Sequence, residues 1–175
     1  MRTIYFKGST PKMLFPIISW LIRLFEWSSI SHNYTDLNSG DTPQLFHARF
    51  NRVGFDPKEE YEPTVYIKYV FPVKVTEEKY QEIFSYLQSI EEKKKGYFIQ
   101  LFGIAIISPL RWLGIDVANP FRSLYNSMMC SQICRHIAIE ILNFKEIEGA
   151  PRPENYYTTD FIKLMQNNLK ISGQE

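Results

Sequence analysis

The chain has 175 residues, of which 45% are hydrophobic and 15% aromatic, and this composition is typical of a globular protein rather than a disordered one. Twenty basic and nineteen acidic residues leave a net charge of +1, without the strong positive charge that nucleic-acid-binding domains carry. We therefore expect one domain spanning residues 1–175, with no nucleic acid among its partners.

Three further features concern location. A polar segment at 7–10 interrupts the N-terminal residues before the apolar core of a secretory signal could form. The most hydrophobic stretch, 98–115, contains a glutamine, a proline and an arginine, which predicts buried core rather than a membrane span. Cys130 and Cys134 are four residues apart, a spacing that suits one helix face better than a disulfide. We expect a cytoplasmic protein without an integral membrane span.

The order of strand and helix patterns predicts an α+β fold with an antiparallel sheet. Alternating residues predict strands, and apolar residues that recur at helical spacing predict helices. The expected strands cover 2–7, 31–37, 44–50 and 64–75, and the expected helices cover 12–27, 77–95, 97–107, 130–144 and 159–169. Turns or loops are expected at 8–11, 38–43 and 56–63.

Single residues refine two of these boundaries. Pro72 predicts that the strand at 64–75 frays late or bulges. Thr76 is a favourable N-cap for the helix that follows, Lys93 to Lys95 fill its last turn, and Gly96 is a stop signal. Five apolar residues at helical spacing predict the buried stripe of that helix: Tyr80, Ile83, Phe84, Leu87 and Ile90.

The second and third strands are expected to form a hairpin that brings two histidines together. A six-residue loop at 38–43 pairs positions whose numbers sum to 81, so that His32 faces Arg49 and Tyr34 faces His47. Both histidines then lie on one face as diagonal neighbours, about 7–8 Å apart at the backbone. At this separation the two imidazole rings can come into contact.

Cys130 begins the helix predicted at 130–144, where the partial positive charge of a helix N-terminus stabilises a thiolate. A thiolate, a proton carrier and a group that orients the carrier are what nucleophilic catalysis needs. Cys134 lies one turn deeper and is expected to be a buried, neutral thiol. His136 lies about 240° round the helix from Cys130, so we expect a solvated or capping residue and not the base.

Several segments resemble, in this order, the circularly permuted papain-fold group that includes NlpC-type peptidases and lecithin:retinol acyltransferase. The segment at 18–37, ISWLIRLFEWSSISHNYTDL, resembles the group's helix, polar turn and Ser-His strand. QLFHARF at 44–50 resembles the next strand, which carries a second histidine in the acyltransferases. GYFIQLFGI at 96–104, MCSQICRHI at 129–137 and NYYTTDFIKLM at 155–165 resemble its Gly-Tyr helix, its nucleophile motif and its closing helix.

The resemblance implies a permuted papain-like fold and a cysteine-dependent hydrolase that uses no cofactor and no metal. Cys130 would be the nucleophile, His32 the general base and acid, and His47 the third member, a position that varies within the group between His, Glu and Gln. Two residues depart from the pattern. Gln132 stands where the group often has glutamate, and Asn33 stands where many members have valine or tryptophan.

Other interpretations stay open at this point. The two cysteines and two strand histidines are zinc-ligand types, although their spacing matches none of the usual zinc motifs. The chain could also be a catalytically silent binding module for a peptide or lipid, or a lipid acyltransferase. The substrate could be a peptide, a peptidoglycan stem, an isopeptide or an acyl lipid, and the 11 tyrosines and 13 phenylalanines slightly favour an apolar or acyl group.

Overall fold

The computed structural model describes residues 1–12, 19–20, 22–24, 28–38, 43–48, 52–91, 98–115, 117–120 and 129–172. Within these ranges, five strands form one antiparallel sheet in the order β4-β3-β2-β1-β5. Their bounds are β1 Arg2–Pro11, β2 His32–Asp36, β3 Gln44–Ala48, β4 Val53–Pro57 and β5 Val65–Val75. The predicted α+β class and antiparallel sheet are confirmed.

The helices are α2 Lys58–Tyr61, α3 Glu77–Glu91, α4 Phe98–Trp112, α5 Cys130–His136 and α6 Thr158–Ser172. A π-helical segment, Ile137–Ile141, continues α5, and short 3₁₀ turns occupy Glu62–Thr64 and Pro153–Asn155. No helix among the described residues is both long and apolar enough to cross a membrane.

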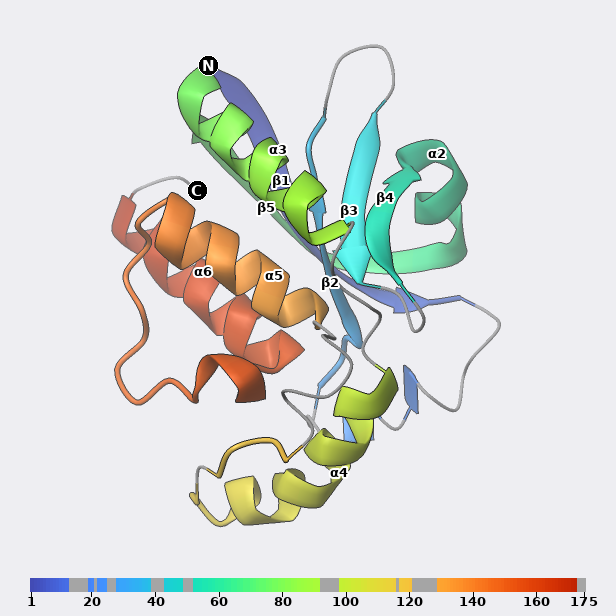
Figure 1. The fold of residues 1–175 in the computed structure, drawn as a ribbon, viewed down its shortest axis with the longest axis vertical. Coiled ribbons are helices and arrows are strands. Elements are labelled where there is room, and N and C mark those ends of the chain that lie inside the picture. Colours follow the sequence, from blue (N-terminus) through green and yellow to red (C-terminus); the bar gives the residue numbers. More distant parts are fainter. Residues whose placement is uncertain are drawn as a thin grey trace.

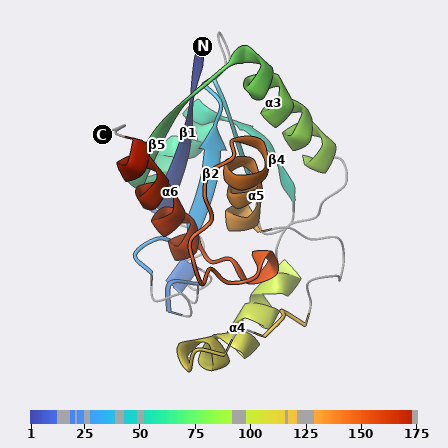
Figure 2. The same ribbon diagram turned by 90° about the vertical axis from the view of Figure 1, so that its left-hand side faces the viewer.

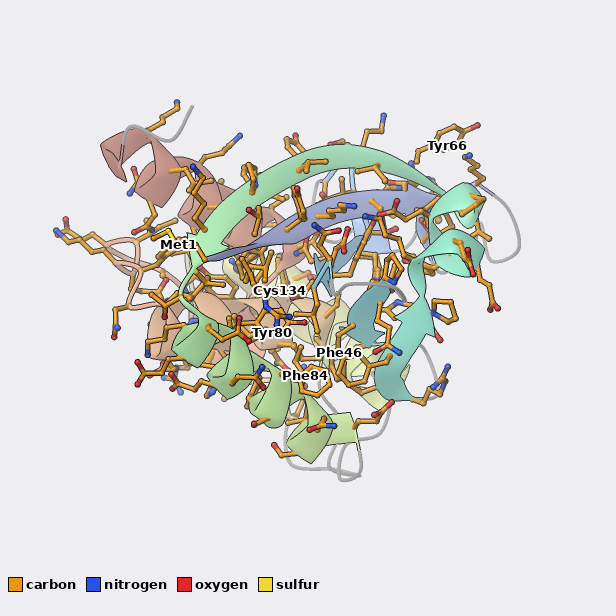
Figure 3. The ribbon with its side chains drawn as sticks, turned by 90° about the horizontal axis from the view of Figure 1, so that it is seen from above. Met1, Phe46, Tyr66, Tyr80, Phe84 and Cys134 are labelled. Carbon is orange, nitrogen blue, oxygen red and sulfur yellow. The ribbon has the colours of Figure 1, made fainter. Side chains whose placement is uncertain are left out.

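The main core lies between the sheet and the three helices α3, α5 and α6 (Figures 1 and 2). α2 lies beside β4 on the other side, and α4 lies at one end of the molecule (Figure 1). Figure 3 shows Phe46, Tyr80 and Cys134 turned inward between α3 and the sheet, whereas Tyr66 lies at the periphery. Large buried side chains from both layers fill this core: Ile4, Phe6, Leu37, Phe46, Ile83, Leu87, Ile133, Tyr156 and Phe161.

The turn predicted at 8–11 is wrong, because β1 continues through these residues to Pro11. Glycine, serine and threonine match turn chemistry, but β5 runs antiparallel along the whole segment and supplies hydrogen-bond partners. The pairing shifts where Gly8 faces Tyr69 and Ser9 faces Ile67, which leaves Lys68 as the extra residue of a β-bulge.

The strand expected to fray late or bulge because of Pro72 does bulge, but the bulge is at Lys68 and not at the proline. Pro72 pairs with Tyr5, and the ladder continues to Val75 opposite Arg2. β5 is an edge strand, where proline is tolerated because one side of the strand needs no ladder hydrogen bond.

β4 was not predicted, and it occupies the start of the loop expected at 56–63. Gly54, Asp56 and Pro57 lower the strand propensity of this short segment. It nevertheless pairs with β3 along its whole length: Pro57 faces Gln44 at one end and Val53 faces Ala48 at the other. Val53 contributes a buried side chain to the core. The rest of the expected loop forms α2 and a 3₁₀ turn.

The expected helices are present, but the one predicted at 130–144 ends at Ile141 and becomes π-helical from Ile137. Thr76 caps α3, since the Lys79 N–H donates to Thr76 Oγ1 at 3.2 Å, and four of the five stripe residues are buried. α4 extends past the predicted end at 107 and includes Pro109 near its last turn. Residues 19–20 and 22–24 of the helix expected at 12–27 are helical. The rest of that helix, the loop tip at 39–42, Arg49, Lys93 to Lys95 and Gly96 lie outside the described residues.

Candidate active site

The structure brings His32 and His47 into direct contact. β2 and β3 pair Thr35 with Phe46 and Asp36 with Leu45, so the predicted register, in which pairs sum to 81, is confirmed. His32 Nε2 lies 3.0 Å from His47 Nδ1. Both imidazoles are buried, with 8% and 3% of their residues' surface exposed. The two rings therefore form a hydrogen-bonded pair on one face of the hairpin.

A third group, Asp56 on β4, extends this pair. His47 Nε2 is hydrogen-bonded to Asp56 Oδ2, and the Arg52 guanidinium donates to Asp56 Oδ1 at 2.7 Å. β3 and β4 pair Leu45 with Asp56, two residues from His47, which puts the carboxylate on the same face as the imidazole. Asp56 is buried, whereas the Arg52 side chain is about half exposed. We call His32, His47 and Asp56 the relay.

Sequence reasoning missed Asp56 because it assigned this residue to a loop. A signal was present in the alternation of small or polar residues with Val53 and Phe55, which is a short strand pattern directly after the second histidine strand. A hairpin between the two strands would have predicted Asp56 close to His47.

Two tyrosines surround the relay and limit its contact with water. The Tyr61 ring lies 4.4 Å from the His47 ring, and the Tyr34 ring stacks beside His32 at 6.3 Å. Burial, aided by the neighbouring Glu62 carboxylate, raises the pKa of Tyr34 far above its ordinary value. Tyr34 therefore stays a neutral phenol, and its hydroxyl donates to Glu62 at 3.3 Å.

Cys130 lies where the ladder between β2 and β3 opens. The Leu37 N–H donates to Gln44 O at 3.1 Å, and N–H groups of alternate residues along a strand point the same way, so the Asn33 N–H points toward β3. Among the described residues the ladder stops at Thr35 and Phe46. The Asn33 N–H donates instead to Cys130 Sγ, at 3.5 Å.

This hydrogen bond locates the thiol relative to the relay. Asn33 directly follows His32, so Cys130 Sγ lies within about 6 Å of the His32 Cα atom. The sulfur is thus at the opening between the two strands that carry the histidines, at the start of α5. The structure brings the three predicted site residues into one region.

The two residues that depart from the family pattern hold this region together. Gln132 Oε1 accepts a hydrogen bond from the Met129 N–H at 2.9 Å and so caps the start of α5. Asn33 is fully buried and its side-chain amide donates to Thr158 O at 3.3 Å, which ties β2 to the start of α6.

Cys134 has different surroundings from Cys130. It is buried one turn deeper in α5, with its sulfur 3.7 Å from Thr35 Oγ1. Burial, together with the nearby Cys130 sulfur, raises the pKa of the Cys134 thiol. The two sulfurs face different residues of β2, and no three His, Cys, Asp or Glu side chains in the described ranges are arranged to hold a metal ion.

His136 is partly exposed and packs against α3. It stacks on Tyr86 of α3, with ring centroids 4.2 Å apart and planes 19° apart, and partial burial lowers the pKa of its imidazole. It lies in the last turn of α5, whereas Cys130 begins that helix.

No protein-family model matches the chain, and the curated proteins contain no match either. The functional assignment therefore rests on the residues and the geometry described above.

Proposed function

We propose that the protein is a cysteine-dependent hydrolase that cleaves an amide, isopeptide or ester bond through Cys130, His32 and His47. The observation that carries the proposal is the His32–His47 hydrogen bond beside a thiol held at the opening of the same two strands. The bond to His47 engages Nε2 of His32, so Nδ1 is the nitrogen that would take the thiol proton. The order of the site residues along the chain supports a permuted papain-like fold.

The proposed reaction proceeds in two halves. His32 takes the proton of Cys130, and the thiolate attacks the substrate carbonyl, forming a C–S bond and an oxyanion. The His32 imidazolium then gives its proton to the leaving amine or alcohol as the C–N or C–O bond breaks, which leaves a thioester. Water attacks the thioester, and His32 takes a proton from this water. The C–S bond then breaks, which releases the acid, and the His32 imidazolium returns its proton to the Cys130 sulfur.

Backbone groups can stabilise the oxyanion in both halves. The first N–H groups of a helix have no carbonyl partner in the preceding turn, and they begin here at the residue that carries the nucleophile. Donors fixed in place near the developing charge are the usual means of stabilising such an intermediate. A reducing compartment such as the cytoplasm would keep both free thiols available.

The test is the rate at which iodoacetamide alkylates Cys130 between pH 5 and pH 9, followed by mass spectrometry of the labelled peptide. We expect the native protein to react at Cys130 at pH 7, and His32→Ala to react much more slowly, because its thiol has lost its proton acceptor. Cys134→Ala is the matched control and should keep the reactivity of the native protein. Equal rates in the native protein and His32→Ala across this range would refute the pairing.

A catalytically silent binding module is the second candidate, and the burial of the site favours it. Only 4% of the Cys130 surface and 8% of the His32 surface is exposed, and a substrate carbonyl must reach the sulfur. A module of this kind would keep the three residues for packing and hydrogen bonding. In that case Cys130 stays unlabelled in the folded protein and reacts only after denaturation.

A further inference from the structure

We infer that Asp56 is a positioning residue that fixes the direction of the hydrogen bond between His47 and His32, and so makes His32 Nδ1 a proton acceptor. The catalytic consequence of this inference rests on the proposed function, whereas the hydrogen-bond direction does not. The Asp56 carboxylate determines which nitrogen of His47 carries a proton, and this in turn determines which nitrogen of His32 does.

An ionised carboxylate can only accept hydrogen bonds, so the bond between Asp56 Oδ2 and His47 Nε2 requires the proton to be on Nε2. We infer that both relay histidines are neutral, so His47 carries one N–H and its Nδ1 is an acceptor. His32 Nε2, 3.0 Å from that atom, must then be the donor. The neutral His32 ring consequently has its lone pair on Nδ1, which is the form that a general base requires.

Because of Arg52, the direction of the hydrogen bonds in the relay should depend on whether residue 56 is a carboxylate or an amide. Its guanidinium has only N–H donors and engages Asp56 Oδ1 at 2.7 Å. An asparagine at position 56 would turn its carbonyl oxygen toward Arg52 to accept that hydrogen bond. Its NH₂ group would then face His47 Nε2 as a donor, where the carboxylate had been an acceptor.

The substitution Asp56→Asn should therefore reverse the whole relay. His47 would carry its proton on Nδ1 and donate to His32 Nε2, and His32 would carry its own proton on Nδ1. A ring nitrogen that already bears a proton cannot accept the proton of Cys130. The substitution changes one oxygen for one NH₂ group and leaves the volume of the side chain almost unchanged.

The direct test is the protonation state of the ring nitrogens, read from long-range ¹H–¹⁵N spectra of uniformly labelled protein. The chain has three histidines, so the spectrum contains six ring nitrogens, and His136 is an internal control because it stacks on Tyr86 away from the relay. We expect Nε2–H in both His32 and His47 of the native protein at pH 8. We expect Nδ1–H in both rings of Asp56→Asn, with His136 unchanged.

The second readout is the alkylation of Cys130, compared with Glu60→Gln, an exposed carboxylate-to-amide substitution on α2. A reversed relay should lower the rate at pH 7 by on the order of 10- to 100-fold, because a thiol without a proton acceptor is still ionised to a few per cent at this pH. Glu60→Gln should leave it unchanged. A defect that shrinks as pH rises toward 9, where the thiol loses its proton to solvent, would identify a lost proton acceptor rather than a damaged fold.

The outcomes separate the inference from the proposed function. Native protein with an inert Cys130 and Nε2–H in both relay histidines would overturn the hydrolase and leave the role of Asp56 standing. A reactive Cys130 with Nδ1–H on native His32 would overturn the inference alone, and this result needs no variant. The inference is also overturned if folded Asp56→Asn keeps the native protonation pattern of both rings.

Discussion

At the scale of single residues, the site depends on where protons and lone pairs lie. Residue type, spacing and chain order predict His32, His47 and Cys130 as site residues, and the hairpin register explains why the two imidazole rings are in contact. Asp56 could not be identified in the same way, because its importance arises from the pairing of β3 with β4. The alternation at Val53 and Phe55 indicates this strand, but a glycine and a proline make the local signal weak.

His47→Ala should slow Cys130 alkylation less than His32→Ala does. Removal of the second histidine takes away the orienting group and separates His32 from Asp56, but it leaves the proton acceptor and the nucleophile. Alkylation rates at pH 7 for the two variants, with circular dichroism to confirm folding, provide the comparison. A larger defect in His47→Ala would assign the role of base to that residue.

Cys134→Ala should retain Cys130 reactivity and lose about 1–2 kcal/mol in free energy of unfolding, from the small cavity that the missing sulfur leaves. Because burial raises the pKa of the Cys134 thiol, iodoacetamide at pH 7 should label the native protein at Cys130 alone. Urea unfolding and peptide mapping measure the two effects. Preferential labelling of Cys134 would contradict the assignment of the nucleophile.

At the scale of elements, the sequence predicted those helices and strands whose own residues carry a clear capping or periodicity signal. α3 has its N-cap and its apolar stripe in the chain itself, and β2, β3 and β5 show clear strand patterns. The turn expected at 8–11 fails because long-range pairing with β5 overrides local turn chemistry. The π-helical segment after α5 has no recognised pattern of its own and depends on packing against neighbouring elements.

Gly8→Ala should destabilise the fold by about 1–3 kcal/mol, because the added carbon overfills a buried space. A Cβ atom there would lie 2.9 Å from Ile30 Cδ1 and 3.1 Å from Ile162 Cδ1, and both isoleucines are buried. Lys74→Ala, at an exposed position of β5, is the control. Equal urea midpoints for the two variants would show that the bulge has room for a side chain.

At the scale of the whole molecule, a buried group of charges joins the polar side of the sheet to the segment after β4. Lys7 of β1 and Lys58 of α2 both lie 2.7 Å from Asp36 of β2, and Lys7 also contacts Glu62. Asp36 has no solvent exposure. Burial alone would raise the pKa of this carboxyl, but the hydrogen bonds from Lys58 and Lys7 outweigh burial and lower it.

Stability should consequently fall in acid, and part of that fall should be absent in Asp36→Asn. A carboxyl whose pKa is lower in the folded state contributes its full stabilisation above the unfolded pKa of about 4, and this contribution disappears as pH falls through the folded value. Asp36→Asn should also cost about 1.5–3 kcal/mol at pH 7, the usual value of a hydrogen bond to a charged group, because Lys7 keeps its contact with Glu62. Free energies of unfolding at pH 7 and pH 3 for both proteins test this, and parallel pH profiles would exclude Asp36 as the source.

The hydrogen bond from the Asn33 N–H to Cys130 Sγ has a practical consequence as well. A backbone amide resonance is sensitive to the charge of the atom that it donates to, so the Asn33 peak in an ordinary ¹H–¹⁵N spectrum should follow the sulfur through ionisation, alkylation and thioester formation. The protein thus contains its own spectroscopic probe of the thiol. Candidate substrates can be screened by the movement of one peak, whichever bond is cleaved.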